Sequence, residues 1–205
     1  MKKSALIFIC IFALLFGGCA KRQNTPLGRG LELIGDMEVL INDEDLAARY
    51  NVYGERYESE IQKLRDVNFS KPKAVYKVTF DDRELLDAAN GEKVSDEVAE
   101  VYESRVASTL GSYLNSQGSM ESIIIASMVT TSSVFDCKKV EENMVYFYVY
   151  KDVVIAVGFV DGDGDACYAS ASIVTNENLD TSDAKSFDDS LESLVDCDFE
   201  VKKVY

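Results

Sequence analysis

The segment MVYFYVYKDVVIAVGFV, Met144–Val160, predicts two neighbouring strands at the centre of a sheet. In its first half, Val145, Phe147 and Val149 alternate with tyrosines, as expected of a strand whose side chains point to opposite faces. Lys151 and Asp152 form a tight turn. The second half, Val153–Val160, is apolar at nearly every position, which is typical of a strand covered on both faces.

The residues that follow extend this antiparallel meander. The run from Cys167 to Val174 alternates small and polar residues and predicts a third strand. A helix capped near Asp180–Ser182 comes next, and its apolar residues share one face: Phe187, Leu191, Leu194 and Val195. Cys197–Tyr205 then alternates again, which predicts a strand that returns to the sheet.

The first half of the chain is mostly helical by the same criteria. One helix is expected from Asn42 onward, with a stripe of apolar residues three and four positions apart: Leu46, Tyr50, Tyr53, Tyr57, Ile61 and Leu64. We expect this tyrosine-rich stripe to pack into the core rather than to form a ligand platform.

A strand is expected at Lys73–Phe80, and Ser95 caps a second long helix that ends at Asn115–Gly118. Ile123–Phe135 suits a strand or a helix, because its β-branched residues favour a strand whereas the spacing of its apolar residues also suits a helix. The fold class predicted is α+β, with helices packed on an antiparallel β-meander sheet in a single domain, residues 31–205.

Composition excludes several classes of function. The net charge of −15 argues against nucleic-acid binding and disfavours an orientation that lies flat on an anionic lipid face. The chain has no histidine, which excludes a catalytic Ser–His or Cys–His pair and a histidine-ligated zinc site. No catalytic residue is assigned.

Two groups of residues are candidate sites. Asp161, Asp163 and Asp165 alternate with glycine, and such a loop can bind Ca²⁺, although the same residues also suit a simple hairpin turn. Apart from this calcium, no cofactor is expected. Tyr146, Tyr148 and Tyr150 form one face of the first central strand, and they are either a ligand-binding face or a surface packed beneath a helix.

The first residues have the three parts of a secretory signal peptide. Lys2 and Lys3 precede the apolar run Ala5–Phe16, which ends in Gly17 and Gly18 before Cys19. The run is shorter than the roughly 20 apolar residues that a membrane-spanning helix needs.

LLFGGC, the six residues that end at Cys19, resembles the lipobox of bacterial lipoproteins, with Phe16 where leucine is most common. The resemblance implies that residues 1–18 are a signal peptide and that Cys19 becomes a lipid-acylated (palmitate-bearing) first residue. Residues 19–30 would then be the lipidated cysteine and its tether. The alternatives are an ordinary cleaved signal peptide or an uncleaved anchor.

Three other cysteines remain in the mature chain: Cys137, Cys167 and Cys197. One disulfide with one free thiol is expected, or three buried thiols, and spacing does not choose among the pairs.

The function expected is that of a binding or interaction module on the extracytoplasmic face of the cell membrane. By resemblance to lipoprotein sorting, Ala20 favours the outer membrane if the host has one. The partners would be the membrane, through the lipid, and envelope proteins or glycans. The alternatives are a carboxylate-dependent hydrolase of envelope glycans and a structural envelope protein.

Overall fold

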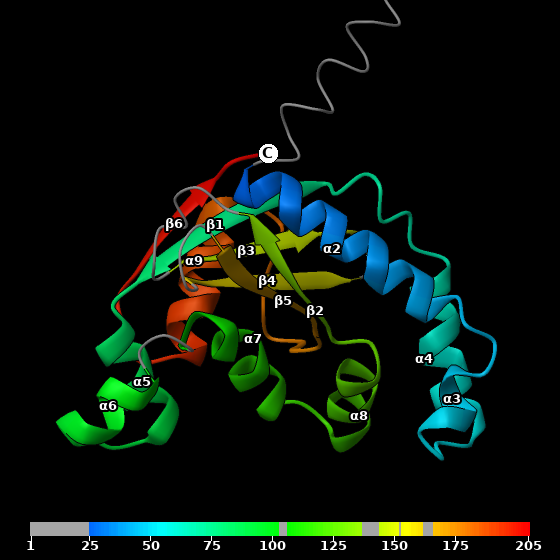
Figure 1. The fold of residues 1–205 in the computed structure, drawn as a ribbon, viewed down its shortest axis with the longest axis horizontal. Coiled ribbons are helices and arrows are strands. Elements are labelled where there is room, and N and C mark those ends of the chain that lie inside the picture. The colour runs from blue at the N-terminus through cyan, green and yellow to red at the C-terminus, as the bar shows by residue number, and fades with distance from the viewer. Residues whose placement is uncertain (1–24, 103–105, 137–143, 152, 162–165) are drawn as a thin grey trace, which may run out of the picture.

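The computed structural model describes residues 25–102, 106–136, 144–151, 153–161 and 166–205 of the chain. Within these residues, eight helices pack against one six-stranded sheet in which every strand pair is antiparallel (Figure 1). The predicted α+β class is therefore confirmed.

The sheet is centred on the predicted meander. Its strand order is β2-β5-β4-β3-β1-β6, so β3 (Met144–Val149), β4 (Val154–Asp161) and β5 (Ala166–Val174) are consecutive neighbours. β1 (Ala74–Phe80) pairs with β3 and also with β6 (Phe199–Lys203), which confirms that the last segment returns to the sheet. β2 (Thr131–Asp136) forms the other edge. The meander thus supplies three strands, and the outer strands come from distant parts of the chain.

One face of the sheet is covered by α2 (Pro26–Ile41), which crosses above it (Figure 1). Thr25 caps this helix, since its hydroxyl oxygen accepts a hydrogen bond of 3.1 Å from the Gly28 nitrogen, and proline stands at the first helical position. Residues 26–30 were predicted as part of a tether, and that assignment is wrong: they form the start of α2, a helix with one buried face. Two glycines in a short polar stretch indicated a linker, whereas in the structure both are buried and Gly30 packs against Tyr148 of β3.

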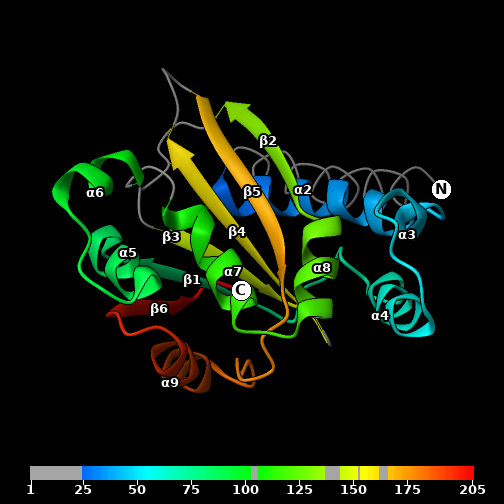
Figure 2. The ribbon, with the colours of Figure 1, turned by 90° about the horizontal axis from the view of Figure 1, so that it is seen from below.

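The opposite face of the sheet is covered by α7 (Val106–Ser116), α9 (Ala184–Leu194) and α5 (Asp82–Asn90). Figure 2 shows α7 in front of β4 and β5, and α9 beside β6. Phe187 of α9 stacks on Tyr76 of β1 with ring centroids 4.6 Å apart. The sheet is therefore the middle of three layers, and both faces of its central strands are buried, as the apolar sequence of β4 predicts.

The helix predicted from Asn42 to Leu64 is broken in two. The structure has α3 (Leu46–Arg49) and α4 (Glu55–Arg65), separated by Asn51 with φ of 53° and Gly54 with φ of 132°. These positive φ values are incompatible with a continuing right-handed helix. Tyr50 and Tyr53 fall in the break and are 52% and 72% exposed, so the prediction that they join the core is also wrong.

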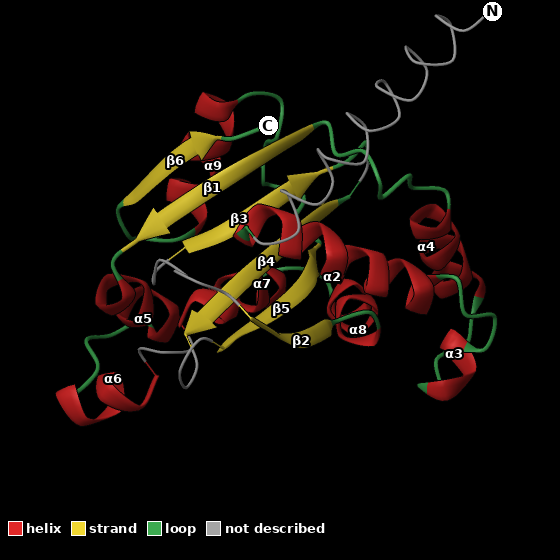
Figure 3. Cartoon of the chain, turned by 45° about the horizontal axis from the view of Figure 1, so that its top comes forward, coloured by secondary structure: helices red, strands yellow, loops and turns green. Residues whose placement is uncertain are grey.

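The ambiguous segment Ile123–Phe135 contains both structures in succession. α8 (Met120–Met128) is capped by Ser119, and β2 begins three residues after it ends (Figure 3). Three consecutive isoleucines continue the helix because Ser119 provides its N-cap and Ile125 packs into the core. The remaining helix, α6 (Asp96–Tyr102), lies with α7 in the region predicted as the second long helix.

Candidate functional site

The three tyrosines of β3 and its exit are not a ligand face. Tyr146, Tyr148 and Tyr150 are all buried, and Tyr148 has no exposed surface. The Tyr148 hydroxyl donates a hydrogen bond of 2.8 Å to the Leu27 carbonyl of α2, and the Tyr150 hydroxyl donates one of 2.9 Å to the Phe69 carbonyl. Burial raises the pKa of both phenols. The structure therefore corrects this candidate site: the three side chains are buried, and the hydroxyls of Tyr148 and Tyr150 bond to α2 and to the loop before β1.

The aspartate loop falls largely outside the described residues. Asp161 is the last residue of β4, and Asp163 and Asp165 lie in the segment that the structure does not describe. Among the described residues, no three potential ligands gather into a group that could hold a metal ion. Calcium binding by this loop stays a prediction.

Cys19 and the rest of the lipobox also lie outside the described residues. No helix in the described part of the chain is long and apolar enough to span a bilayer.

The two described cysteines differ in state. Cys167 of β5 is disulfide-bonded, and Cys197 is a free thiol. Burial is the main cause that raises the pKa of the Cys197 thiol to about 12, with nearby carboxylates adding to it. Such a thiol is protonated and unreactive at neutral pH, which argues against a nucleophilic role.

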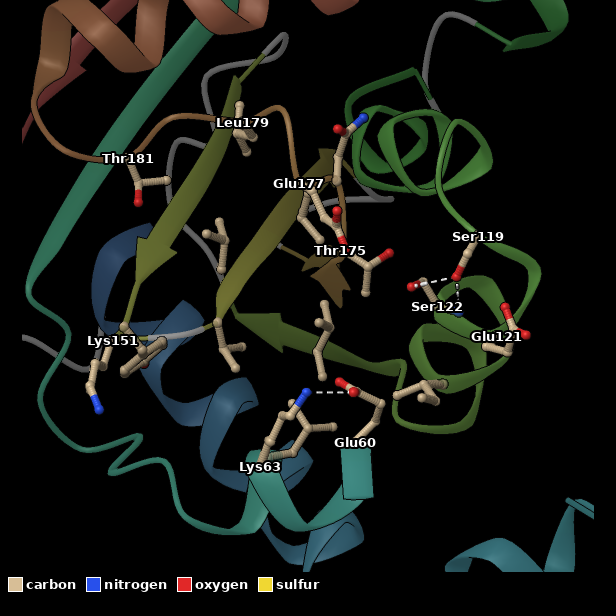
Figure 4. A pocket seen from close by; sticks show the side chains of 18 of the residues that line it. Glu60, Lys63, Ser119, Glu121, Ser122, Lys151, Thr175, Glu177, Leu179 and Thr181 are labelled. Carbon is tan, nitrogen blue, oxygen red and sulfur yellow. Dashed lines mark hydrogen bonds and ion pairs between the residues drawn. The ribbon is translucent and has the colours of Figure 1, made fainter. Parts of the chain in front are cut away.

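A pocket of about 450 Å³ lies at one end of the sheet. It is lined by α4, by the start of α8, by the turn between β3 and β4, and by the segment that follows β5 (Figure 4). These four segments are far apart in the sequence, and only the fold brings them together. We refer to this feature as the end pocket.

The floor and the rim of the end pocket differ in chemistry. Its apolar lining combines aliphatic residues with the ring of Tyr150: Leu64, Ile125, Val153, Val154, Ile173, Val174 and Leu179. Hydroxyl, amide and charged side chains complete the lining: Arg56, Glu60, Lys63, Ser119, Glu121, Ser122, Lys151, Thr175, Asn176, Glu177 and Thr181. The pocket therefore offers an apolar surface bordered by charges of both signs.

Ion pairs hold the charged side chains of α4 at the rim. Arg56 reaches Glu121 at the start of α8 with a distance of 3.2 Å between nitrogen and oxygen, and Lys63 pairs with Glu60 at 2.5 Å. A backbone hydrogen bond is the main cause that lowers the pKa of Glu121, and Arg56 and Ser119 lower it further. This carboxyl group is thus held as an anion.

One buried side chain positions the wall formed after β5. Asn115 of α7 donates a hydrogen bond of 2.7 Å to the Ile173 carbonyl, and its own carbonyl oxygen accepts bonds from the nitrogen of Thr175 at 2.9 Å and its hydroxyl at 3.1 Å. A buried amide with three partners orients the backbone it contacts. Asn115 therefore fixes the chain as it leaves the sheet and enters the pocket wall.

Sequence reasoning did not identify the end pocket. Its lining residues show no motif, because each is an ordinary apolar or polar residue within its own segment. The helix start at Ser119 carries a local capping signal, but a cap alone does not indicate a pocket.

Comparisons with known proteins give no family for this chain: no family model, no curated protein and no solved structure matches it.

Proposed function

We propose that this protein is a lipoprotein, anchored through Cys19 to the extracytoplasmic face of a membrane, that binds an extended peptide segment of an envelope protein in the end pocket. The observation that supports the binding role is the end pocket itself, with its aliphatic floor and its rim of both charge signs. The anchor rests on the signal peptide and lipobox residues that end at Cys19.

The chemistry of the lining favours a peptide over a glycan. A peptide presents apolar side chains, charged side chains and backbone donors and acceptors along one strand, which matches a floor of Leu64 and Ile173 beneath a rim of Arg56 and Lys63. A glycan site would use exposed aromatic rings. Tyr150 is the aromatic residue that lines the end pocket, and it is buried with its hydroxyl bonded to Phe69.

A carboxylate-dependent hydrolase fits the end pocket less well. A general acid in a glycosidase needs a carboxyl group whose pKa is raised. Glu121 lines the pocket, but its pKa is lowered and it pairs with Arg56. Glu60 forms an ion pair with Lys63. Binding without turnover is therefore our proposal.

The anchor is tested by fractionating cells that express the wild type or Cys19→Ala and by measuring the intact mass of each product. We expect the wild type in the membrane fraction with added acyl mass, and the variant without it. An unmodified wild-type mass would refute the anchor.

The binding role is tested by placing a photo-crosslinking amino acid at Ser122, which lines the end pocket, and at Ser127, which is exposed on the same helix outside the lining. In intact cells we expect position 122 to crosslink to one recurring peptide segment, and position 127 to give no such product. In a second experiment the crosslinking amino acid is placed at Thr181, which also lines the pocket. Ser122→Phe, which fills the pocket, should abolish the crosslink to the peptide from this position, and Ser127→Phe should leave that crosslink unchanged. Crosslinks that are equally diverse at both positions would refute peptide binding, and a cleaved product would favour the hydrolase.

A further inference from the structure

The loop between α4 and β1 contains the segment Asn68-Phe69-Ser70. An asparagine followed two positions later by serine or threonine, with no proline between them, is the acceptor sequence for N-linked glycans in exported proteins. Asn68 is the one asparagine of the chain that meets this requirement. All three residues of the segment lie in the part of the chain that the structure describes.

Burial alternates along this segment. Phe69 is 3% exposed, whereas Asn68 and Ser70 on either side of it are exposed. The Phe69 ring packs edge-to-face on Tyr150 with ring centroids 5.3 Å apart, and its carbonyl oxygen accepts a hydrogen bond of 2.9 Å from the Tyr150 hydroxyl. Phe69 therefore anchors the loop to the protein core, and the two polar residues that a transferase must recognise are presented to solvent.

Two hydrogen bonds fix the orientation of the Asn68 carboxamide. The backbone nitrogen of Ser70 donates to Asn68 Oδ1 at 3.2 Å, and the Ser70 hydroxyl donates to the same oxygen at 2.7 Å. A backbone N–H group can only donate, so the atom it meets is the carbonyl oxygen and not the amide nitrogen. Asn68 Nδ2 donates no hydrogen bond to any residue that the structure describes. The nitrogen that would bear a glycan is therefore accessible on an exposed side chain.

A bulky group at Asn68 need not disturb the rest of the protein. Leu64, four residues earlier, lines the end pocket, but neither Asn68 nor Ser70 does. The backbone turn is closed by a hydrogen bond from the Lys71 nitrogen to the Asn68 carbonyl, which does not involve the carboxamide. Large hydrophilic modifications are accommodated on surface loops, because there they displace water rather than packed side chains.

The compartment required is the one given by the proposed function, and the inference rests on it in this respect. Export through the signal peptide that ends before Cys19 would bring Asn68 to the extracytoplasmic face of the membrane. Acylation of Cys19 would then hold the chain at a membrane, where a lipid-linked sugar donor is also held.

We propose that Asn68 is the acceptor of an N-linked glycan, transferred from an oligosaccharide linked to a lipid diphosphate. Asn68 Nδ2 forms a bond to the anomeric carbon of the first sugar, and the bond between that carbon and the diphosphate oxygen breaks. The lipid diphosphate leaves with the electron pair of the broken bond. One proton of the carboxamide passes to a base of the transferase, so the step is a substitution with no oxidation or reduction.

The test uses the full-length protein purified from the membranes of its own host. We expect fragmentation mass spectrometry to place a glycan on Asn68, and the intact mass of Asn68→Gln to lack the whole mass of that glycan. Asn178→Gln is the matched control, because Asn178 is also exposed in a loop but is followed by Asp180 at the position that corresponds to Ser70. This control should keep the glycan.

Variants of Ser70 separate recognition of the acceptor sequence from misfolding. Ser70→Ala removes the hydroxyl and should abolish the glycan, whereas Ser70→Thr keeps a hydroxyl and should retain it. Urea unfolding of Asn68→Gln with the same midpoint as the unglycosylated wild type, expressed in a host without the transferase, would show that the loss is not caused by misfolding.

The mass of the same samples also reports the anchor. An unmodified Asn68 in protein whose Cys19 bears lipid would overturn the glycosylation and leave the anchor standing. A glycan on Asn68 in protein without lipid would refute the anchor and leave the glycosylation standing. Protein that keeps residues 1–18 and has an unmodified Asn68 would overturn both, and a glycan mass that persists in Asn68→Gln would show that another residue is the acceptor.

Discussion

Gly30 is where α2 comes closest to the sheet, and replacing it with alanine tests how the helix is seated. A Cβ atom at this position would lie 2.8 Å from Cζ of Tyr148 and closer still to its hydroxyl oxygen. Ordinary contacts between carbon atoms are about 3.5–4.0 Å. Tyr148 is fully buried and donates to Leu27, so its ring cannot move without breaking that hydrogen bond.

The expected change in the free energy of unfolding combines three terms. Overpacking a filled core costs about 1–3 kcal/mol. Losing the hydrogen bond of a buried hydroxyl costs about 1–3 kcal/mol more. Alanine regains about 1 kcal/mol over glycine in a helix. We therefore expect Gly30→Ala to destabilise the protein by about 3 kcal/mol.

Gly35→Ala is the matched control on the same helix, because a Cβ there meets no atom within 4 Å. This variant should be neutral or more stable by up to about 1 kcal/mol. Urea unfolding followed by circular dichroism gives both values by linear extrapolation. Adding Tyr148→Phe, which removes the atom closest to the new Cβ, should make the double variant less destabilised than the sum of the two single changes. If Gly30→Ala unfolds at the same urea concentration as Gly35→Ala, the close contact between α2 and Tyr148 is refuted.

Three further predictions concern single side chains. Asn115→Ala should destabilise the protein by about 2–4 kcal/mol in the same urea assay, because it leaves the Ile173 carbonyl and the Thr175 nitrogen without their partner; an unchanged midpoint would contradict the buried network. Cys197, with its pKa raised to about 12, should react with iodoacetamide at pH 8 at least about 100-fold more slowly in the folded protein than in urea, as measured by mass, and equal rates would contradict the raised pKa. Asp183 caps α9 by accepting a hydrogen bond of 2.9 Å from the Ser186 nitrogen, which lowers its pKa. The ionised Asp183 carboxylate therefore stabilises the folded protein at a pH above its unfolded pKa of about 3.9, and this stabilisation is lost as the pH falls through the folded pKa. We expect Asp183→Ala to have a lower free energy of unfolding than wild type at pH 7. The difference between the two proteins should shrink below about pH 4.

The strands could be predicted because their signal is local. Alternation along Met144–Val149 and the apolar run of β4 are properties of consecutive residues, and they predicted the core of the sheet and the fold class correctly. The return of Phe199–Lys203 to the sheet was predicted in the same way. The helix break at Asn51 and Gly54 was missed, because the apolar spacing continued through it while the backbone adopted positive φ values.

The site residues depended on long-range packing instead. Alternation showed that Tyr146, Tyr148 and Tyr150 share one face, but it could not show that α2, more than 100 positions earlier, covers them. The end pocket joins four segments that are distant in the sequence. Sequence periodicity reports which side chains share a face, because it depends on neighbours along the chain. What covers that face, or leaves it open to a ligand or a membrane, depends on contacts between residues far apart in the sequence, and those contacts form only when the chain folds.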